Sequence, residues 1–182
     1  MTESTIGVFV GSVREGRAGE QVRDWIVEAA KERDIEYRVI DLVDHVLPLM
    51  SAAIPPAAAN KTYDDEHVTR FSQAIDECDG FLFVTPEYNH SVPGPMKNAF
   101  DSLGGEWVGK PVAFVSYGAE GGVRAVEAWR PAVANLYMPQ ARAQIALRLA
   151  TDFGDNGLEP EAHQGEQLTK TLDELEKLVG NH

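Results

Sequence analysis

The chain has 182 residues, of which 43% are hydrophobic and 25% are charged, so we expect one folded domain over residues 1–182. This composition excludes a disordered tail, a collagen-like repeat and a fibrous coil, and no apolar run approaches the roughly 20 residues that span a bilayer. The formal net charge of −13 disfavours nucleic acid and anionic membrane surfaces as partners.

Apolar runs alternate with helical repeats along the chain. They predict, in order, a strand at 6–10, a helix at 22–30, a strand at 37–40, a helix at 68–78, a strand at 81–84, a helix at 96–103, a strand at 112–115, a helix at 123–136, a strand at 141–149 and a helix at 168–179. The strands are continuously apolar, which is typical of parallel sheets buried on both faces. We therefore predict an α/β fold in three layers: a doubly wound, five-stranded parallel sheet in flavodoxin-like order.

The single cysteine, Cys78, excludes an intrachain disulfide and a cysteine-rich zinc site. Cys78 ends an apolar helical stripe, so we interpret it as a small buried hydrophobic residue and not as a nucleophile. The five histidines are not spaced as metal ligands, and we expect no metal site. Segments 47–60 and 151–165 are expected to be irregular connections, and the first follows the second strand on the ligand-binding side of the sheet.

The loop after the first strand carries a glycine-rich and basic sequence that ends at a helix N-terminus. Backbone N–H groups at such a position bind anions, Ser12 adds a hydroxyl, and Arg14 and Arg17 add charge-assisted donors for phosphate oxygens. The loop matches neither the Walker A motif nor the G-x-G-x-x-G motif. The alternative interpretation is a polar turn with two solvated arginines.

The loops after the third and fourth strands are expected at the same edge of the sheet, because ligands of such folds bind at the carboxyl ends of the strands. Prolines shape the first of these loops, and Tyr88 and Asn89 suit a flat heterocycle with amide-like edges. Glycines dominate the second loop and free backbone N–H groups for a planar ligand. The alternatives are a rigid capped turn and a flexible connection.

Together, three segments resemble the NADPH-dependent FMN reductases, which are flavodoxin-like quinone, azo-dye and flavin reductases. The segments are Gly11-Ser12-Val13-Arg14, Thr85-Pro86-Glu87-Tyr88-Asn89 with Pro93 and Lys97-Asn98-Ala99, and Ser116-Tyr117-Gly118 with Gly121-Gly122. The resemblance covers nearly the whole chain up to the fifth strand. It implies an FMN-dependent NAD(P)H oxidoreductase that transfers a hydride from NADPH or NADH through FMN to a quinone-like, azo or flavin acceptor, with no catalytic side chain.

The resemblance also implies which residues bind the cofactor. Ser12 and Arg14 match positions that hold the FMN phosphate, whereas Ser116, Gly118 and Gly121 match the loop near one edge of the ring. The loop that lies along the isoalloxazine ring, largely through backbone groups, is matched by Pro86, Glu87, Tyr88 and Asn89.

The first loop departs from the family pattern at two places. A second hydroxyl residue and an asparagine are common there, where this chain has Arg17 and Gly19. We expect Arg17 to bond the FMN phosphate or to point towards the phosphate of NADPH.

Two other functions remain open: a flavodoxin-type electron carrier, which the arginine-bearing loop argues against, and an FMN-binding redox sensor. A dehydrogenase that uses only nicotinamide is disfavoured because the glycine fingerprint is absent. The expected partners are a small-molecule electron acceptor and further copies of the chain, in a homodimer or homotetramer. Pro93, Phe100 and Trp107 either build that interface or pack in the core. The N-terminus, Met1 to Thr5, lacks a basic start and an apolar stretch, so the expected location is the cytoplasm.

Overall fold

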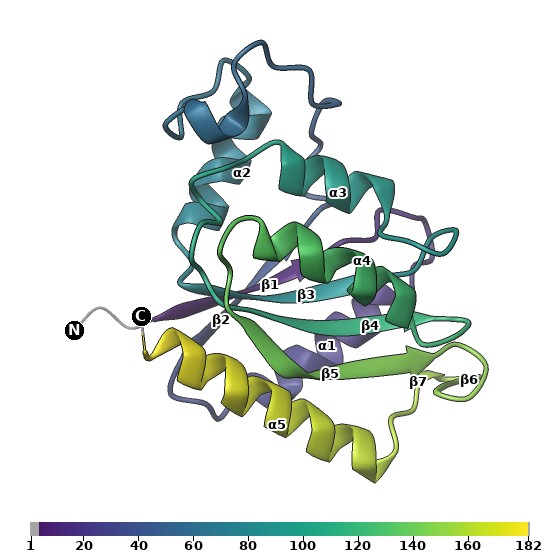
Figure 1. The fold of residues 1–182 in the computed structure, drawn as a ribbon. Helices are drawn as coiled ribbons and strands as arrows, with labels where there is room; N and C mark the ends of the chain where they lie inside the picture. Colours follow the sequence, from purple (N-terminus) through teal and green to yellow (C-terminus); the bar gives the residue numbers. More distant parts are fainter. Residues whose placement is uncertain (1–3, 182) are drawn as a thin grey trace.

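Five parallel strands form the central sheet of the molecule, which we describe over residues 4–181 of a computed structural model. The expected location in the cytoplasm rests on the N-terminal residues 1–5. Of these, residues 1–3 lie outside the described residues. The strand order is β2-β1-β3-β4-β5, which confirms the doubly wound, flavodoxin-like fold (Figure 1). The elements are β1 (Thr5–Val10), α1 (Gly19–Ala30), β2 (Glu36–Asp41), the 3₁₀ helix η1 (Pro56–Ala58), α2 (Glu66–Asp76), β3 (Gly80–Pro86), α3 (Gly94–Asp101), β4 (Val112–Gly118), α4 (Val123–Ala134), β5 (Gln140–Arg148), β6 (Phe153–Gly154), β7 (Gly157–Leu158) and α5 (Ala162–Val179).

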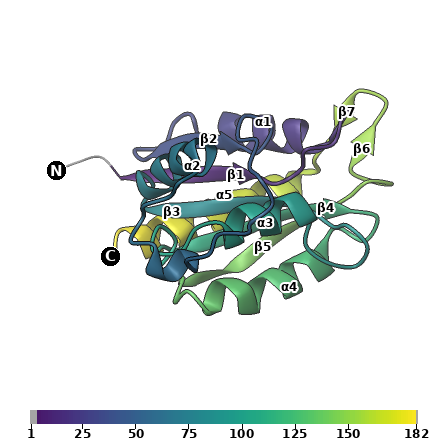
Figure 2. The same cartoon turned by 90° about the horizontal axis from the view of Figure 1, so that it is seen from above.

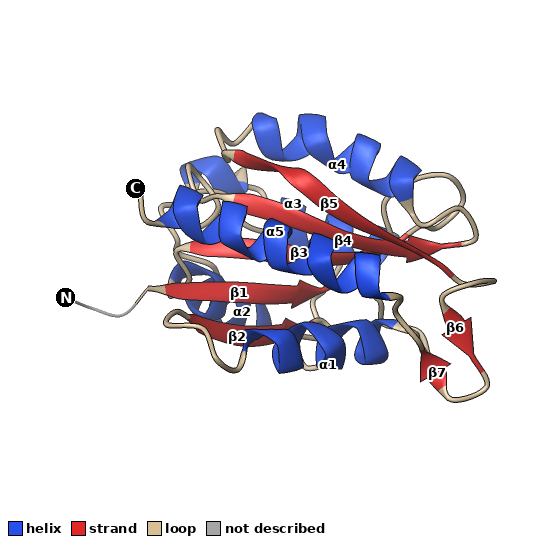
Figure 3. Cartoon of the chain, turned by 90° about the horizontal axis from the view of Figure 1, so that it is seen from below, coloured by secondary structure: helices blue, strands red, loops and turns tan. Residues whose placement is uncertain are grey.

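Helices cover both faces of this sheet. Helices α2, α3 and α4 pack on one face, and α1 and α5 pack on the other, as Figure 3 shows from below. Every residue of β1, β3 and β4 is buried, whereas the edge strands β2 and β5 are only partly buried. Burial on both faces is why the central strands are continuously apolar, and it leaves the strand ends as the place for polar chemistry.

The segment from 151 to 165 is more ordered than the sequence predicts. It contains a two-stranded antiparallel sheet, β6 with β7, which is too short to leave a periodic signal in the sequence. The side chain of Gln21 in α1 accepts a hydrogen bond of 2.6 Å from the backbone N–H of Leu158. This bond ties the hairpin to the start of α1, beyond the end of β5 (Figure 2).

Aromatic side chains fill the core between the sheet and helices α2, α3 and α4. Trp107 is completely buried, its indole N–H donates to the Phe100 carbonyl at 3.2 Å, and its ring lies 4.8 Å from that of Phe81. Phe100 and Pro93 are buried as well. Of the two interpretations of these residues, packing in the core is confirmed, and exposure at a subunit interface is wrong, because burying Phe100 and Trp107 stabilises the domain itself.

The thiol of Cys78 is buried, and its Sγ lies 3.4 Å from the carbonyl oxygen of Ala74. Burial raises the pKa of Cys78 to about 11, so the thiol stays protonated and unreactive at neutral pH.

Over residues 4–181, no three His, Cys, Asp or Glu side chains are grouped so that they could hold a metal ion. None of the helices described is long and apolar enough to cross a membrane.

Candidate functional site

The loops after β1, β3 and β4 meet at the carboxyl edge of the sheet. Three hydrogen bonds link them: Gly11 N–H to the Val84 carbonyl at 3.0 Å, Glu87 N–H to the Tyr117 carbonyl at 3.2 Å, and a 2.8 Å bond between the hydroxyls of Ser12 and Tyr88. The strand order reverses between β1 and β3, so these loops flank the switch point at which doubly wound sheets bind ligands.

The loop after β1 and the start of α1 form what we call the amide cradle, residues 12–20. No backbone N–H in the cradle donates to an acceptor among the described residues 4–181. Gly16 has a φ of +64°, and the residue before α1, Ala18, provides no side-chain cap. An uncapped helix N-terminus with unpaired amides attracts anions, because the helix dipole and the N–H groups both favour negative charge.

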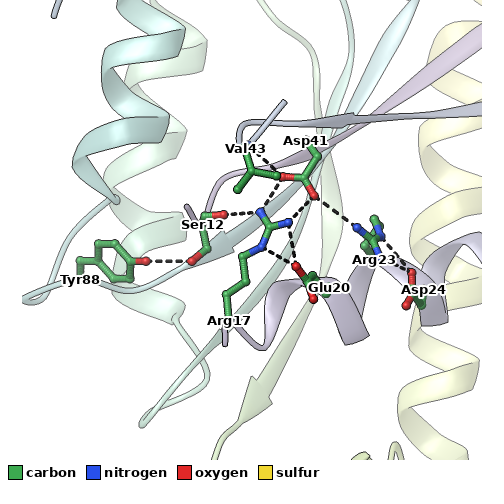
Figure 4. Close-up of polar contacts among 8 residues, drawn as sticks. All are labelled: Ser12, Arg17, Glu20, Arg23, Asp24, Asp41, Val43 and Tyr88. Carbon is green, nitrogen blue, oxygen red and sulfur yellow. Dashed lines mark hydrogen bonds and ion pairs between the residues drawn. The ribbon is translucent and has the colours of Figure 1, made fainter. Parts of the chain in front are cut away.

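The side chain of Arg17, a residue of the cradle, is turned into the protein (Figure 4). Its guanidinium donates twice to the carboxylate of Asp41, at 2.5 and 2.7 Å, and once to the carbonyl of Ser12, at 2.5 Å. The remaining two N–H groups donate to Glu20, at 3.2 and 3.1 Å. Since a guanidinium has five N–H groups, none is left for a phosphate.

These contacts differ from both sequence-based expectations for Arg17. The residue is only 8% exposed, so it is not a solvated arginine, and protein groups accept from all five of its N–H donors. The hydrogen bonds from Arg17 to Asp41 raise the pKa of Arg17, and the ion pair fastens the end of β2 to the loop after β1. The sequence analysis missed Asp41 and Glu20, and the only signal for Asp41 was its position at the end of an apolar strand.

Arg14 has the opposite environment. Its side chain is exposed, and it forms no ion pair with any residue from 4 to 181. Because Arg17 is neutralised by the buried carboxylate of Asp41 and the exposed carboxylate of Glu20, Arg14 is the arginine of this loop that has its donors available for an anion.

The loop after β3 is a two-residue hairpin. The backbone groups of Tyr88 and Ser91 exchange two hydrogen bonds of 3.1 Å. Asn89 and His90 form the exposed tip with φ values of +48° and +71°, as a type I′ turn requires. Asparagine tolerates this left-handed conformation, whereas histidine does so at a cost in stability.

An ion pair fastens this hairpin to the start of α4. The buried carboxylate of Glu87 lies 2.5 Å from Nη2 of Arg124 and accepts from the Arg124 backbone N–H at 3.3 Å. A Cβ on Gly118 would lie 3.4 Å from the Cβ of Glu87, so the loop after β4 closes tightly against the hairpin. The Glu87 carboxylate is therefore paired with Arg124 and holds the two loops together.

The loop after β4 is also held by its own side chains. The Ser116 hydroxyl contacts the carbonyl oxygens of Gly121, at 2.7 Å, and Ile145, at 3.2 Å. Gly121 and Gly122 have φ values of +74° and +72°, which only glycine adopts without strain. Ser116 and Glu87 shape the edge, and the backbone groups of the two loops are left to face a ligand.

A cleft of about 340 Å³ lies beside the cradle. It is lined by Val13, Leu42, Val43, His45, Val46, Leu47, Pro95 and Asn98. Asn98 fixes its wall by donating to the Pro48 carbonyl and accepting from the Met50 N–H, both at 2.9 Å. Burial lowers the pKa of His45, so this lining is uncharged at neutral pH.

The model of the NADPH-dependent FMN reductase family matches residues 4–152 of this chain. The chain belongs to this family. It is 34% identical to the NAD(P)H-dependent FMN reductase ntnL of Nectria sp, over 96% of both chains. It is 37% identical to a quinone reductase of Pseudomonas putida, over 74% of this chain and 72% of the relative. The solved structure of the flavoenzyme NAD(P)H:(acceptor) oxidoreductase FerB from Paracoccus denitrificans has the same fold, with a TM-score of 0.77, 22% identity and 98% of each chain covered.

The turn at the tip of the hairpin generates a stability prediction. Replacing His90 with glycine should raise the free energy of unfolding by about 1 kcal/mol, because glycine adopts a positive φ without strain. Urea denaturation measures the change. Asn89→Gly is the matched control and should give a smaller gain. A loss of stability in His90→Gly would show that the histidine side chain makes contacts that outweigh the strain.

Proposed function

We propose that this protein is an FMN-dependent NAD(P)H oxidoreductase that transfers a hydride from NADPH or NADH, through bound FMN, to a quinone-like, azo or flavin acceptor. Membership of the FMN reductase family supports the cofactor, and relatives named quinone reductase support the class of acceptor. The structural observation that supports the proposal is the amide cradle, a set of N–H groups without acceptors in the described chain, at the switch point of the sheet.

The residues present fit the phosphate end of FMN. A phosphate monoester carries acceptor oxygens and up to two negative charges, and the cradle offers unpaired N–H donors, the Ser12 hydroxyl and the free guanidinium of Arg14. In this proposal Ser12 and Arg14 bind the phosphate. Arg17 is a positioning residue, because its contact with the Ser12 carbonyl sets the direction of the loop.

The ring would lie along the loops after β3 and β4, against Pro86, Glu87, Tyr88 and Asn89 on one side and Ser116, Gly118 and Gly121 on the other. The backbone N–H groups of Asn89, His90, Ala119 and Glu120 have no acceptor within the described chain and are available to its polar edge. When bound, FMN supplies the two-electron chemistry. The protein orients it, and N–H donors stabilise negative charge on its reduced form.

The activity is tested by the absorption spectrum of the purified protein and by initial rates over a grid of NADPH and quinone concentrations. We expect bound oxidised flavin and parallel double-reciprocal lines, because two flat substrates cannot stack together on one open face of the ring. Intersecting lines with a detected ternary complex would contradict the single site. Bound flavin without steady NADPH consumption would instead support a carrier or a sensor.

The roles of the first loop are tested by comparing FMN with riboflavin, which lacks the phosphate. Arg14→Ala should weaken FMN binding by about 1.5–3 kcal/mol and leave riboflavin binding unchanged. Asp41→Asn removes a negative charge near the phosphate, which by itself would favour FMN binding. We nevertheless expect weaker FMN binding, because Arg17 loses the carboxylate that holds it in place. Tighter FMN binding by Asp41→Asn would contradict the positioning role of Arg17.

We propose that the protein forms a homodimer or homotetramer through the segment from 43 to 54. Its side chains Val46 and Leu49 are 72% and 82% exposed, and Val43, Met50 and Ile54 add further apolar surface. Light scattering should give the mass of two or four copies, and Leu49→Glu should shift it to one copy. An unchanged mass in that variant would place the interface elsewhere. Location in the cytoplasm stays a prediction.

A further inference from the structure

Tyr117, near the end of β4, carries a buried hydroxyl that is not used by the protein. The residue is 5% exposed, and its Oη has no hydrogen-bond partner among the described residues. A buried hydroxyl without a partner destabilises the folded state. Phenylalanine would fill nearly the same space without that cost. The hydroxyl therefore does not contribute to the stability of the folded state, and another role must account for it.

The position of this hydroxyl is at the N-terminus of α1. A Cβ on Gly19, the first residue of the helix, would lie only 2.6 Å from Tyr117 Oη. The hydroxyl therefore occupies the space that a side chain at residue 19 would fill, buried next to the amide cradle.

The surroundings leave the hydroxyl protonated and free to donate. Burial raises the pKa of Tyr117, with Ser12 and Arg17 acting in the opposite direction. Ser12 lowers the pKa of Tyr117 through its nearby hydroxyl, but the hydrogen bond whose geometry is formed joins Ser12 to Tyr88, at 2.8 Å. Among residues 4–181 the Tyr117 hydroxyl makes no hydrogen bond of good geometry, and the neighbouring cradle consists of donors that also lack acceptors.

We propose that Tyr117 donates a hydrogen bond to the anion in the amide cradle, which is the FMN phosphate if the proposed function holds, and that Gly19 leaves the room for this contact. One anion then satisfies the phenol and the backbone amides together. The stability lost through an unpaired hydroxyl in the free protein is recovered on binding, since the hydrogen bond forms only when the anion is present.

Tyr117→Phe tests the proposal, because it removes one oxygen and predicts changes of opposite sign. The flavin-free variant should melt about 2–4 °C higher than the flavin-free parent, since an unpaired buried hydroxyl is gone. Its dissociation constant for FMN should rise about tenfold, and that for riboflavin should not change. Equal weakening of both flavins would mean that Tyr117 only supports packing, and unchanged FMN binding would overturn the proposal.

Two further variants sharpen this test. Tyr37→Phe is the matched control, because the Tyr37 hydroxyl has a partner, Glu176 at 2.7 Å, outside the cradle. This variant should melt lower and bind FMN as the parent does. Gly19→Ala should weaken FMN binding by displacing the hydroxyl, and should add little to the effect of Tyr117→Phe in the double variant. Full additivity would show that the two residues act separately.

Inorganic phosphate separates failure of this inference from failure of the proposed function. Phosphate should raise the melting temperature of the flavin-free parent more than that of Tyr117→Phe. A parent that responds to phosphate but not to FMN would contradict the proposed cofactor and keep the anion site. A parent that binds FMN with the same phosphate response as Tyr117→Phe would contradict the role of Tyr117 alone.

Discussion

The parallel direction of all five strands is the constraint on which the site depends. Parallel strands need crossover helices, so both sheet faces are covered and the central strands carry almost no polar groups. The polar side chains and free amides are left to the loops, and the loops after β1, β3 and β4 all emerge at one edge. The strand order then separates the connections on either side of β1, which opens the edge for a ligand.

Electrostatics at this edge is set by backbone dipoles more than by net charge. The chain carries a formal net charge of −13, yet the amide cradle offers unpaired N–H groups and the positive end of a helix, beside the exposed side chains of Arg14 and Glu15. The buried positive charge of Arg17 is balanced by Asp41 and Glu20, and Arg23 adds a weaker contact to Asp41 at 3.3 Å (Figure 4). This network fixes the shape of the loop and adds little net charge to it.

Ion pairs with one buried carboxylate recur around the edge. Asp41 fastens the end of β2 to the cradle through Arg17, and Glu87 fastens the hairpin after β3 to the start of α4 through Arg124. Each pair joins segments that are distant in sequence. Such pairs are weak evidence for stability but fix one loop geometry, which a preorganised binding site needs.

The sequence by itself determined the fold and the family, and it predicts the edge of the sheet at which a ligand binds. Continuous apolar strands and helical repeats predicted the α/β order, and the motifs at Gly11–Arg14, Thr85–Asn89 and Ser116–Gly122 identified the family to which the chain belongs. These features are local, because periodicity and turn chemistry act between residues close in the chain. The hairpin β6–β7 was missed because two-residue strands leave no periodic pattern.

Only the tertiary structure decided which side chains are free. Arg14 and Arg17 are alike in sequence, but Arg17 meets Asp41, 24 residues away, whereas Arg14 is exposed. Phe100 and Trp107 are core residues and not an interface because the aromatic cluster closes around them. The unpaired hydroxyl of Tyr117 beside Gly19 is visible only where β4 and α1 come together. Hydrogen-bond partners and burial depend on contacts between distant segments, and a single sequence does not carry that information.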